Sequence, residues 1–233
     1  MILDNADILP NIIWLVIGYL VGSVNFSIIL TLNSKKRESI VNVGSGNPGA
    51  TNALRNYGWK FGLLIFFLDV SKSFWFTFVG VVLLKHTVFF DGLLVQAISL
   101  SVIIGHIFPI FFKFKGGKGA ATNLGIICSI SIILAIIGMI IFLTIFFTTK
   151  YVSLASMTSP FLIAPFTFLP YFNGWYDSFL FNSGVDGSGN LYWLSFVTLT
   201  IAAIITVLTH IPNIKKLIKG TETKTNLKKS VDK

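Results

Sequence analysis

Charged residues are scarce in this chain of 233 residues, of which they make up only 12%. Hydrophobic residues make up 54%, and the mean hydropathy is +0.80. This composition leaves too little polar surface to cover a water-soluble globule. The sequence therefore excludes an ordinary soluble domain and predicts an integral membrane protein.

Cysteine and clustered metal-binding residues are lacking as well. The single cysteine, Cys128, lies in an apolar run, which excludes an internal disulfide and favours a small buried apolar side chain. No repeated cluster of histidine, cysteine or carboxylate residues suggests a metal ion. The Gly-x-x-x-x-Gly-Lys-[Ser/Thr] pattern of nucleotide-binding loops does not occur. We therefore expect neither a metal nor another cofactor.

Long apolar runs are what the chain has in abundance. Each is long enough for the roughly 20 residues that cross a bilayer core as an α-helix. The residues before the first run include Asp4 and Asp7 and no cation, the reverse of a cleaved secretory signal, so this run is expected to remain as a span. The runs cover about 8–32, 61–84, 93–112, 120–149, 151–170 and 191–209.

The distribution of charge predicts the orientation of these spans. Basic residues gather in 33–60, in 113–118 and in the tail from Lys215, which are expected on the cytoplasmic side. Five aspartates, with Lys85 as the one cation among them, are expected on the other side, which places the N-terminus outside and the C-terminus inside: Asp4, Asp7, Asp91, Asp177 and Asp186. This arrangement requires an odd number of crossings, whereas six runs are visible. One crossing must therefore be hidden within a run.

The hidden crossing is expected between Gly119 and Lys150. These 32 residues would form a helix of about 48 Å, too long for one span. We predict two helices that turn near Ser129 and Ser131. The result is an all-α integral membrane protein with seven transmembrane helices, an outer N-terminus and a cytoplasmic C-terminus. Residues 1–214 form one transmembrane domain, and 215–233 form a basic cytoplasmic tail.

Three polar motifs are then expected at the inner surface. The first runs from Gly44 to Arg55, and the second, Gly116 to Thr122, opens a helix. Glycines let backbone N–H groups approach an anion, and a helix N-terminus favours negative charge. The third motif comprises His210, Asn213, Gly220 and Glu222.

Arg55 is notable because lysine supplies sixteen of the eighteen cations in the chain. A guanidinium binds a phosphate with two parallel hydrogen bonds, whereas an ammonium is a point charge. The alternative is an ordinary arginine of an inner loop.

Three other polar features carry less weight. His86 and Asp91 fit a His-x4-Asp pattern but fall in an outer loop, where a chance match is the better interpretation. Asp69 and Lys72 lie within a span and one helical turn apart, which favours a structural ion pair over a functional site. His106 adjoins an apolar run, so a packed histidine and a residue that shapes the second motif are equally acceptable interpretations.

These motifs together resemble the bacterial acyl-phosphate:glycerol-3-phosphate acyltransferases. The resemblance covers nearly the whole chain and rests on 44–55, 105–122, 153–156 and 210–222. It implies a cell-membrane enzyme of phospholipid biosynthesis, with seven helices and an active site on the cytoplasmic side. The transmembrane domain would then be the acyltransferase domain. The reaction it implies is attack of the 1-hydroxyl of sn-glycerol 3-phosphate on an acyl phosphate, which releases phosphate and 1-acyl-glycerol 3-phosphate (lysophosphatidic acid).

The resemblance also implies a set of site residues. The catalytic candidates are His210, Ser45, Lys118, Arg55 and Asn213. The substrate-binding candidates are Gly46, Asn47, Thr51, Asn52, Gly116, Gly117, Thr122, Ser153 and Glu222. Arg55 and Lys118 are the expected cations, Ser45 a phosphate or oxyanion contact, and His210 the candidate general base. The alternative proton acceptor is the acyl phosphate itself.

Both substrates are expected partners, together with anionic membrane lipids that attract the lysine-rich tail. The enzyme that forms the acyl phosphate is a further candidate partner, and nucleic acid is not expected, because the tail lacks interleaved aromatic residues. A small-anion membrane transporter is the alternative function, but it would place polar residues and repeated halves near the bilayer midplane. A non-enzymatic lipid-binding scaffold would leave the four ordered motifs unexplained.

The predicted topology can be tested at Ser153, which it places on the inner side. A Ser153→Cys variant, with Cys128 changed to serine, is expected to react with a membrane-impermeant thiol reagent supplied on the cytoplasmic face of sealed vesicles. Labelling from the outer face alone would contradict the hidden crossing.

Overall fold

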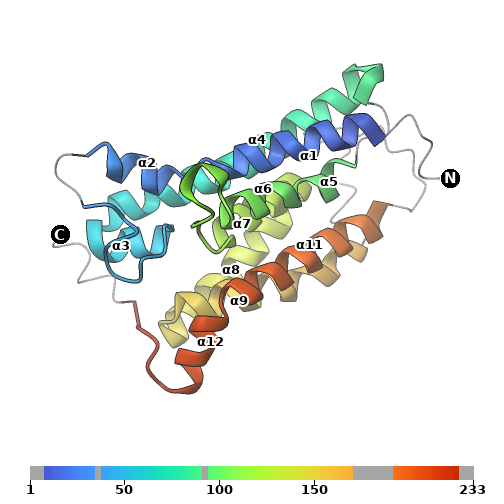
Figure 1. Ribbon diagram of the computed structural model, residues 1–233. Helices are drawn as coiled ribbons and strands as arrows, with labels where there is room; N and C mark the ends of the chain where they lie inside the picture. The colour runs from blue at the N-terminus through green and yellow to red at the C-terminus, as the bar shows by residue number, and fades with distance from the viewer. Residues whose placement is uncertain (1–7, 35–37, 91–93, 170–190, 226–233) are drawn as a thin grey trace.

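The computed structural model describes residues 8–34, 38–90, 94–169 and 191–225, and within these ranges all regular structure is helical. The helices pack side by side in a bundle (Figure 1). The acidic residues used above to orient the N-terminus and outer loops, Asp4, Asp7, Asp91, Asp177 and Asp186, lie outside the described residues. The helices are α1 (Ile8–Ser23), α2 (Phe26–Leu32), α3 (Ala50–Tyr57), α4 (Trp59–His86), α5 (Val95–Ile98), α6 (Leu100–Ile107), α7 (Ala120–Ile130), α8 (Ile132–Thr149), α9 (Val152–Ile163), α11 (Leu191–Thr209) and α12 (Ile211–Ile218), with short 3-10 turns η2 (Val88–Phe90), η3 (Ile110–Phe112) and η4 (Ala164–Phe168).

The long apolar helices agree with a multi-pass membrane protein. Three described segments are long and apolar enough to cross a bilayer: Trp59–Leu83, Val95–Phe112 and Ile132–Thr149. Two bent pairs, α1 with α2 and α11 with α12, reach that length together, and Ala120–Ile130 and Val152–Phe168 are shorter apolar helices. The number of crossings and the orientation of the termini stay predictions.

The predicted turn within 120–149 is confirmed. α7 ends at Ile130, and Ser131 adopts an extended conformation before α8 begins. The Ser131 hydroxyl accepts a hydrogen bond from the Leu134 amide at 3.4 Å, which caps the new helix without proline or glycine.

The first apolar run, in contrast, is not one helix. It breaks between Ser23 and Phe26, and α1 and α2 meet at 41°. Asn25 causes this break, because its side chain caps α2 by accepting a hydrogen bond from the Ile28 amide at 3.2 Å. The apolar composition of the run hid this cap.

Close helix crossings depend on glycines. On α1, a Cβ at Gly22 would lie 2.2 Å from the Val102 carbonyl oxygen of α6, and on α6, a Cβ at Gly105 would lie 2.1 Å from the Tyr19 carbonyl oxygen of α1. Small residues let membrane helices approach to backbone contact in this way. The crossing brings His106, the residue after Gly105, into the centre of the bundle.

The packing brings the basic segments together at one end of the bundle. There α2, α3, the loop before α7 and α12 lie opposite the end at which α1 begins and α4 finishes (Figure 1). The predicted domain boundary after residue 214 falls inside α12, so the chain continues without a break into the segment that follows.

Candidate active site

A cavity of about 220 Å³ lies at this end and is lined by most of the predicted site residues. It has a polar part and an apolar part, the latter formed by side chains such as Leu124, Met139 and Phe142. Gly46, Gly116, Gly117 and Thr122 do not line it. The ten that do are Ser45, Asn47, Thr51, Asn52, Arg55, Lys118, Ser153, His210, Asn213 and Glu222.

The side chain of Asn52 holds the loop that carries the first motif by hydrogen bonds to its backbone. Its side-chain oxygen accepts a hydrogen bond from the Ser45 amide at 3.1 Å, and its amide nitrogen donates to the carbonyls of Ile40 and Val43 at 3.2 and 3.0 Å. Gly44 adopts a φ of +58°, which the tight turn needs. The donors of Asn52, predicted to bind substrate, are thus engaged with the loop, whereas Ser45 is exposed.

The second loop packs against His106. The Gly117 amide donates to the His106 carbonyl at 3.0 Å, and a Cβ at Gly117 would lie 2.1 Å from His106 Nε2. A Cβ at Gly116 would lie equally close to the His106 carbonyl oxygen. Thr122 is fully buried and donates to the Gly119 carbonyl at 2.8 Å. These residues therefore shape the loop from outside the cavity.

Lys118 is held in the cavity by a chain of polar side chains. Its ammonium donates to Asn213 Oδ1, and Asn213 Nδ2 donates to Glu222 Oε1 at 3.0 Å. Ser153 donates to the same carboxylate oxygen at 3.3 Å. Burial lowers the pKa of Lys118, Glu222 partly offsets this effect, and the nearby Lys216 and Arg55 lower it further. The two predicted cations, Arg55 and Lys118, therefore lie in one cavity and repel each other electrostatically.

Arg55 is anchored by residues that the sequence did not single out. Its Nη2 donates to the Thr223 carbonyl at 3.0 Å and to the Thr225 hydroxyl at 2.7 Å. Its buried Nε has no hydrogen-bond partner in the described part of the chain, which leaves a donor for an anion. Burial lowers the pKa of Arg55, and Glu222 partly offsets this. Nothing in the residue types of the lysine-rich tail distinguished Thr223 or Thr225.

His210 follows the last residue of α11 and has a defined proton position. Its Nδ1 lies 2.7 Å from the Thr206 carbonyl oxygen, which only accepts hydrogen bonds, so Nδ1 carries the proton. Burial lowers the pKa of His210 to about 4, and the hydrogen bond to Thr206 only partly opposes this. A neutral imidazole with this tautomer has its lone pair on Nε2.

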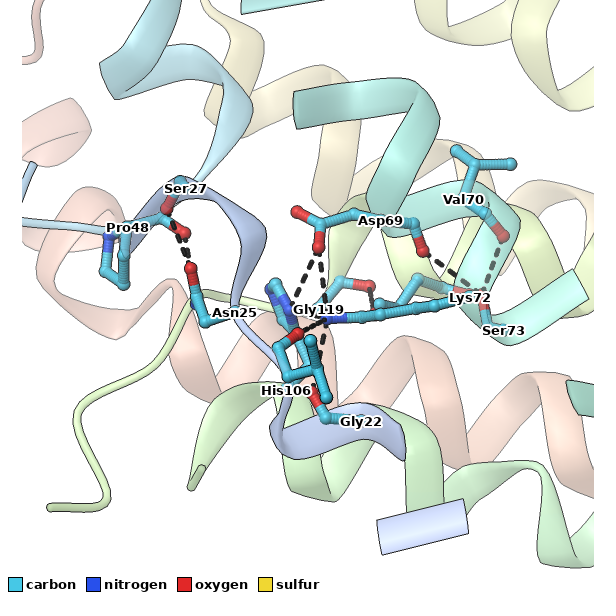
Figure 2. Close-up of polar contacts among 12 residues, drawn as sticks. Gly22, Asn25, Ser27, Pro48, Asp69, Val70, Lys72, Ser73, His106 and Gly119 are labelled. Carbon is cyan, nitrogen blue, oxygen red and sulfur yellow. Dashed lines mark hydrogen bonds and ion pairs between the residues drawn. The ribbon is translucent and has the colours of Figure 1, made fainter. Parts of the chain in front are cut away.

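The predicted ion pair within α4 is confirmed. Lys72 Nζ lies 3.0 Å from Asp69 Oδ1, and both side chains are 4% exposed (Figure 2). His106 joins them, which favours a packed histidine that also shapes the second loop. Asp69 and His106 line the cavity as well, which their spacing in the sequence did not reveal. His86 ends α4, whereas Asp91 lies outside the described residues.

The fold and the cavity together define a helical membrane protein whose cavity is lined by two cations and by apolar side chains. Residues 12–220 match the model of the family "Glycerol-3-phosphate acyltransferase". The chain therefore belongs to the glycerol-3-phosphate acyltransferase family, as its motifs suggested.

Relatives with this name match over nearly their whole length. The chain is 49% identical to one from Mycoplasma mobile, with 91% of each chain covered. It is 37% identical to one from Mycoplasmopsis agalactiae, which covers 97% of this chain and 98% of the relative. It is 36% identical to one from Thermoanaerobacter pseudethanolicus, with 93% and 96% covered.

Solved structures show the same fold. The chain is similar to the crystal structure of PlsY (YgiH), an integral membrane glycerol 3-phosphate acyltransferase, in its glycerol 3-phosphate form, with a TM-score of 0.75, 30% identity and 94% and 97% of the two chains covered. The lysophosphatidic acid form of that protein gives a TM-score of 0.72 at 28% identity, with 96% and 99% covered.

The donor geometry of Arg55 predicts that lysine cannot replace it. An Arg55→Lys variant keeps the charge but loses the planar set of donors, of which Nη2 is anchored and Nε is free. We expect an acyltransferase rate roughly ten- to hundredfold lower, as for the loss of a charge-assisted hydrogen bond of about 1.5–3 kcal/mol. The matched control is Lys113→Arg, at an exposed loop position, and comparable losses in both variants would remove the argument for the planar set of donors.

Proposed function

We propose that the protein transfers an acyl group from an acyl phosphate to the 1-hydroxyl of sn-glycerol 3-phosphate. The products are 1-acyl-glycerol 3-phosphate and inorganic phosphate. The observation that carries this proposal is the placement of Arg55 and Lys118 in one cavity that continues between apolar side chains. Two anionic substrates, one of them with a lipid chain, match these surroundings.

Electrostatics explains why two cations are needed. Two unit charges 4 Å apart repel by about 4 kcal/mol at an effective dielectric constant of 20, so two phosphates in one site need compensating charge. Arg55 and Lys118 supply it, and each phosphate in turn relieves the repulsion between these cations. The hydroxyls of Ser45 and Thr51 and the amide of Asn47 line the same part of the cavity as neutral donors.

The chemistry needs no covalent enzyme intermediate, because an acyl phosphate already carries a good leaving group. The 1-hydroxyl oxygen forms a bond to the carbonyl carbon, and the bond from that carbon to the phosphate oxygen breaks with its electron pair. His210 Nε2 accepts the hydroxyl proton, and Ser45 stabilises the oxyanion or the departing phosphate. Positioning and fixed charge then supply most of the rate acceleration.

The apolar part of the cavity receives the acyl chain. Met139 and Phe142 from α8 and Pro160 and Ile163 from α9 line it, and α7 contributes Ile127. The acyl chain of the substrate thus enters from between membrane helices, while the phosphate groups stay at the polar end of the cavity. This division fits a substrate that arrives from the lipid phase.

The site is proposed to face the cytoplasm of a bacterial cell, in a seven-span arrangement with an outer N-terminus. The loops that form the cavity are the basic ones, which the positive-inside rule assigns to the cytoplasm. α12 carries exposed Lys215 and Lys216 beside exposed Ile211 and Ile218, as expected for a helix on an anionic lipid surface. Family membership favours this enzyme over the alternative of a small-anion transporter.

The donor is tested by measuring phosphate release. Purified protein is expected to release phosphate from acyl phosphate only when glycerol 3-phosphate is present, and to transfer no acyl group from acyl thioesters, because a thioester has no phosphate bonded to its carbonyl carbon. Equal release without glycerol 3-phosphate would indicate a hydrolase, and transfer from thioesters alone would contradict the proposed donor.

The role of His210 is tested by its pH dependence. Because its pKa is lowered to about 4, the base form predominates above about pH 5, and kcat/KM is expected to be level from there to pH 8. A His210→Gln variant is expected to lose about 10²- to 10⁴-fold in kcat. The exposed His86→Gln serves as control. A loss below tenfold would assign the proton to the acyl phosphate instead.

A further inference from the structure

A buried cluster of ionisable side chains, Asp69, Lys72 and His106, borders the cavity and has no part in the mechanism above. Lys72 Nζ lies 3.0 Å from Asp69 Oδ1 and 2.9 Å from His106 Nδ1 (Figure 2). It also lies 3.2 and 3.0 Å from the carbonyl oxygens of Gly22 and Val24. An ammonium has three protons, so these four acceptors more than satisfy it.

The cost of this cluster calls for an explanation. A buried ion pair often stabilises a fold no better than apolar residues of similar size, and charges within membrane spans are expensive. Asp69 and Lys72 are each 4% exposed, and His106 is 3% exposed. Apolar side chains could fill the volume of these three residues if packing were the only requirement. What apolar side chains could not supply is the set of hydrogen bonds that Lys72 makes.

One set of bonds leads from Lys72 to the second loop. Lys72 holds the His106 imidazole, and the His106 carbonyl accepts the hydrogen bond of Gly117 at 3.0 Å. The imidazole fills the space that a Cβ at Gly117 would need. The next residue along the chain is Lys118, so the imidazole determines the position of the backbone from which the Lys118 side chain extends.

Another set leads from Lys72 to the first loop. The break after α1 leaves the Gly22 and Val24 carbonyls free to accept from Lys72, because no continuing helix uses them. The next residue, Asn25, donates to the Pro48 carbonyl at 3.4 Å, inside the first motif (Figure 2). Both sets of hydrogen bonds therefore start from one atom, Lys72 Nζ.

We propose that Lys72 is a positioning residue that aligns the two substrate loops with each other. By bonding to both, its ammonium holds the α1–α2 break at a set distance from the His106 imidazole. As a result, the turn at Ser45 and Asn47 and the Lys118 ammonium face the same pair of phosphates. Asp69 compensates the charge of Lys72. This inference rests on the proposed function, because it assigns both loops to substrate binding.

The test separates the charge of Lys72 from its hydrogen bonds. Lys72→Met is expected to lower the unfolding temperature in detergent, because it leaves the buried Asp69 with only the His106 imidazole, 3.5 Å away, as an ionic partner. The double variant Asp69→Asn/Lys72→Met removes both charges and is expected to recover most of that loss. Its KM for each substrate is nevertheless expected to stay about tenfold or more above wild type, because the two carbonyls and the imidazole have lost their donor.

Two comparisons control this experiment. Asp69→Asn removes the ion pair but keeps the hydrogen bonds of Lys72 to the Gly22 and Val24 carbonyls and to His106, and it is expected to change KM far less than the double variant does. Lys60→Met, at an exposed position of the same helix, is expected to leave unfolding and kinetics unchanged. A double variant with wild-type KM for both substrates would reduce the cluster to a structural ion pair and overturn the proposal.

Two further measurements keep the proposal testable. If the methionine double variant does not fold, Asp69→Asn/Lys72→Gln replaces it; an amide is too short to reach all three partners, so raised KM values are again expected and wild-type values again overturn the proposal. Binding of glycerol 3-phosphate is measured separately by calorimetry. If wild type binds it but uses no acyl phosphate, the proposed donor fails, while weaker binding in the double variant still supports the role of Lys72.

Discussion

The confinement of two like charges, each partly buried, in one cavity is the constraint on which the rest of this structure depends. Arg55 and Lys118 both lose solvation, and each is close enough to Glu222 for that carboxylate to offset part of the cost. Glu222 in turn is fixed by Asn213 and Ser153. The C-terminal segment therefore folds back onto the bundle, and the described part of the predicted tail contributes Glu222 and Thr225 to contacts with Asn213 and Arg55.

Neither loop that carries a cation or a hydroxyl can hold its own shape. The first depends on the side chain of Asn52, and the second on the backbone and ring of His106. Both supports belong to helices, and the position of His106 follows from the close crossing of α1 and α6 at Gly22 and Gly105. The positions of the loop residues at the cavity are thus determined by helix packing. This suits reacting groups that must meet within a fraction of an ångström.

The sequence predicted the elements of this arrangement whose cause is local. The length of 120–149 predicted the turn at Ser131, and spacing along one helix predicted the pair of Asp69 and Lys72. Family motifs gathered Arg55, Lys118 and His210. What could not be predicted has a cause distant in the chain: the glycines at 116 and 117 resemble a phosphate loop, yet they are needed to pack against His106. Thr223 and Thr225 bear on the site only because the tail returns to Arg55.

The position of the cavity at the end of the bundle follows from the chemistry of its proposed substrates. Glycerol 3-phosphate is soluble in water and would be poorly accommodated deep among apolar helices, whereas an acyl chain would be poorly accommodated in a loop exposed to water. A site that joins them must lie where both environments meet. The cavity meets this requirement because Arg55 and Lys118 line it together with apolar side chains such as Phe142. The same requirement disfavours a route across the membrane, because a site for an anion in transit would be open to both sides in turn and would have no use for a fixed apolar end.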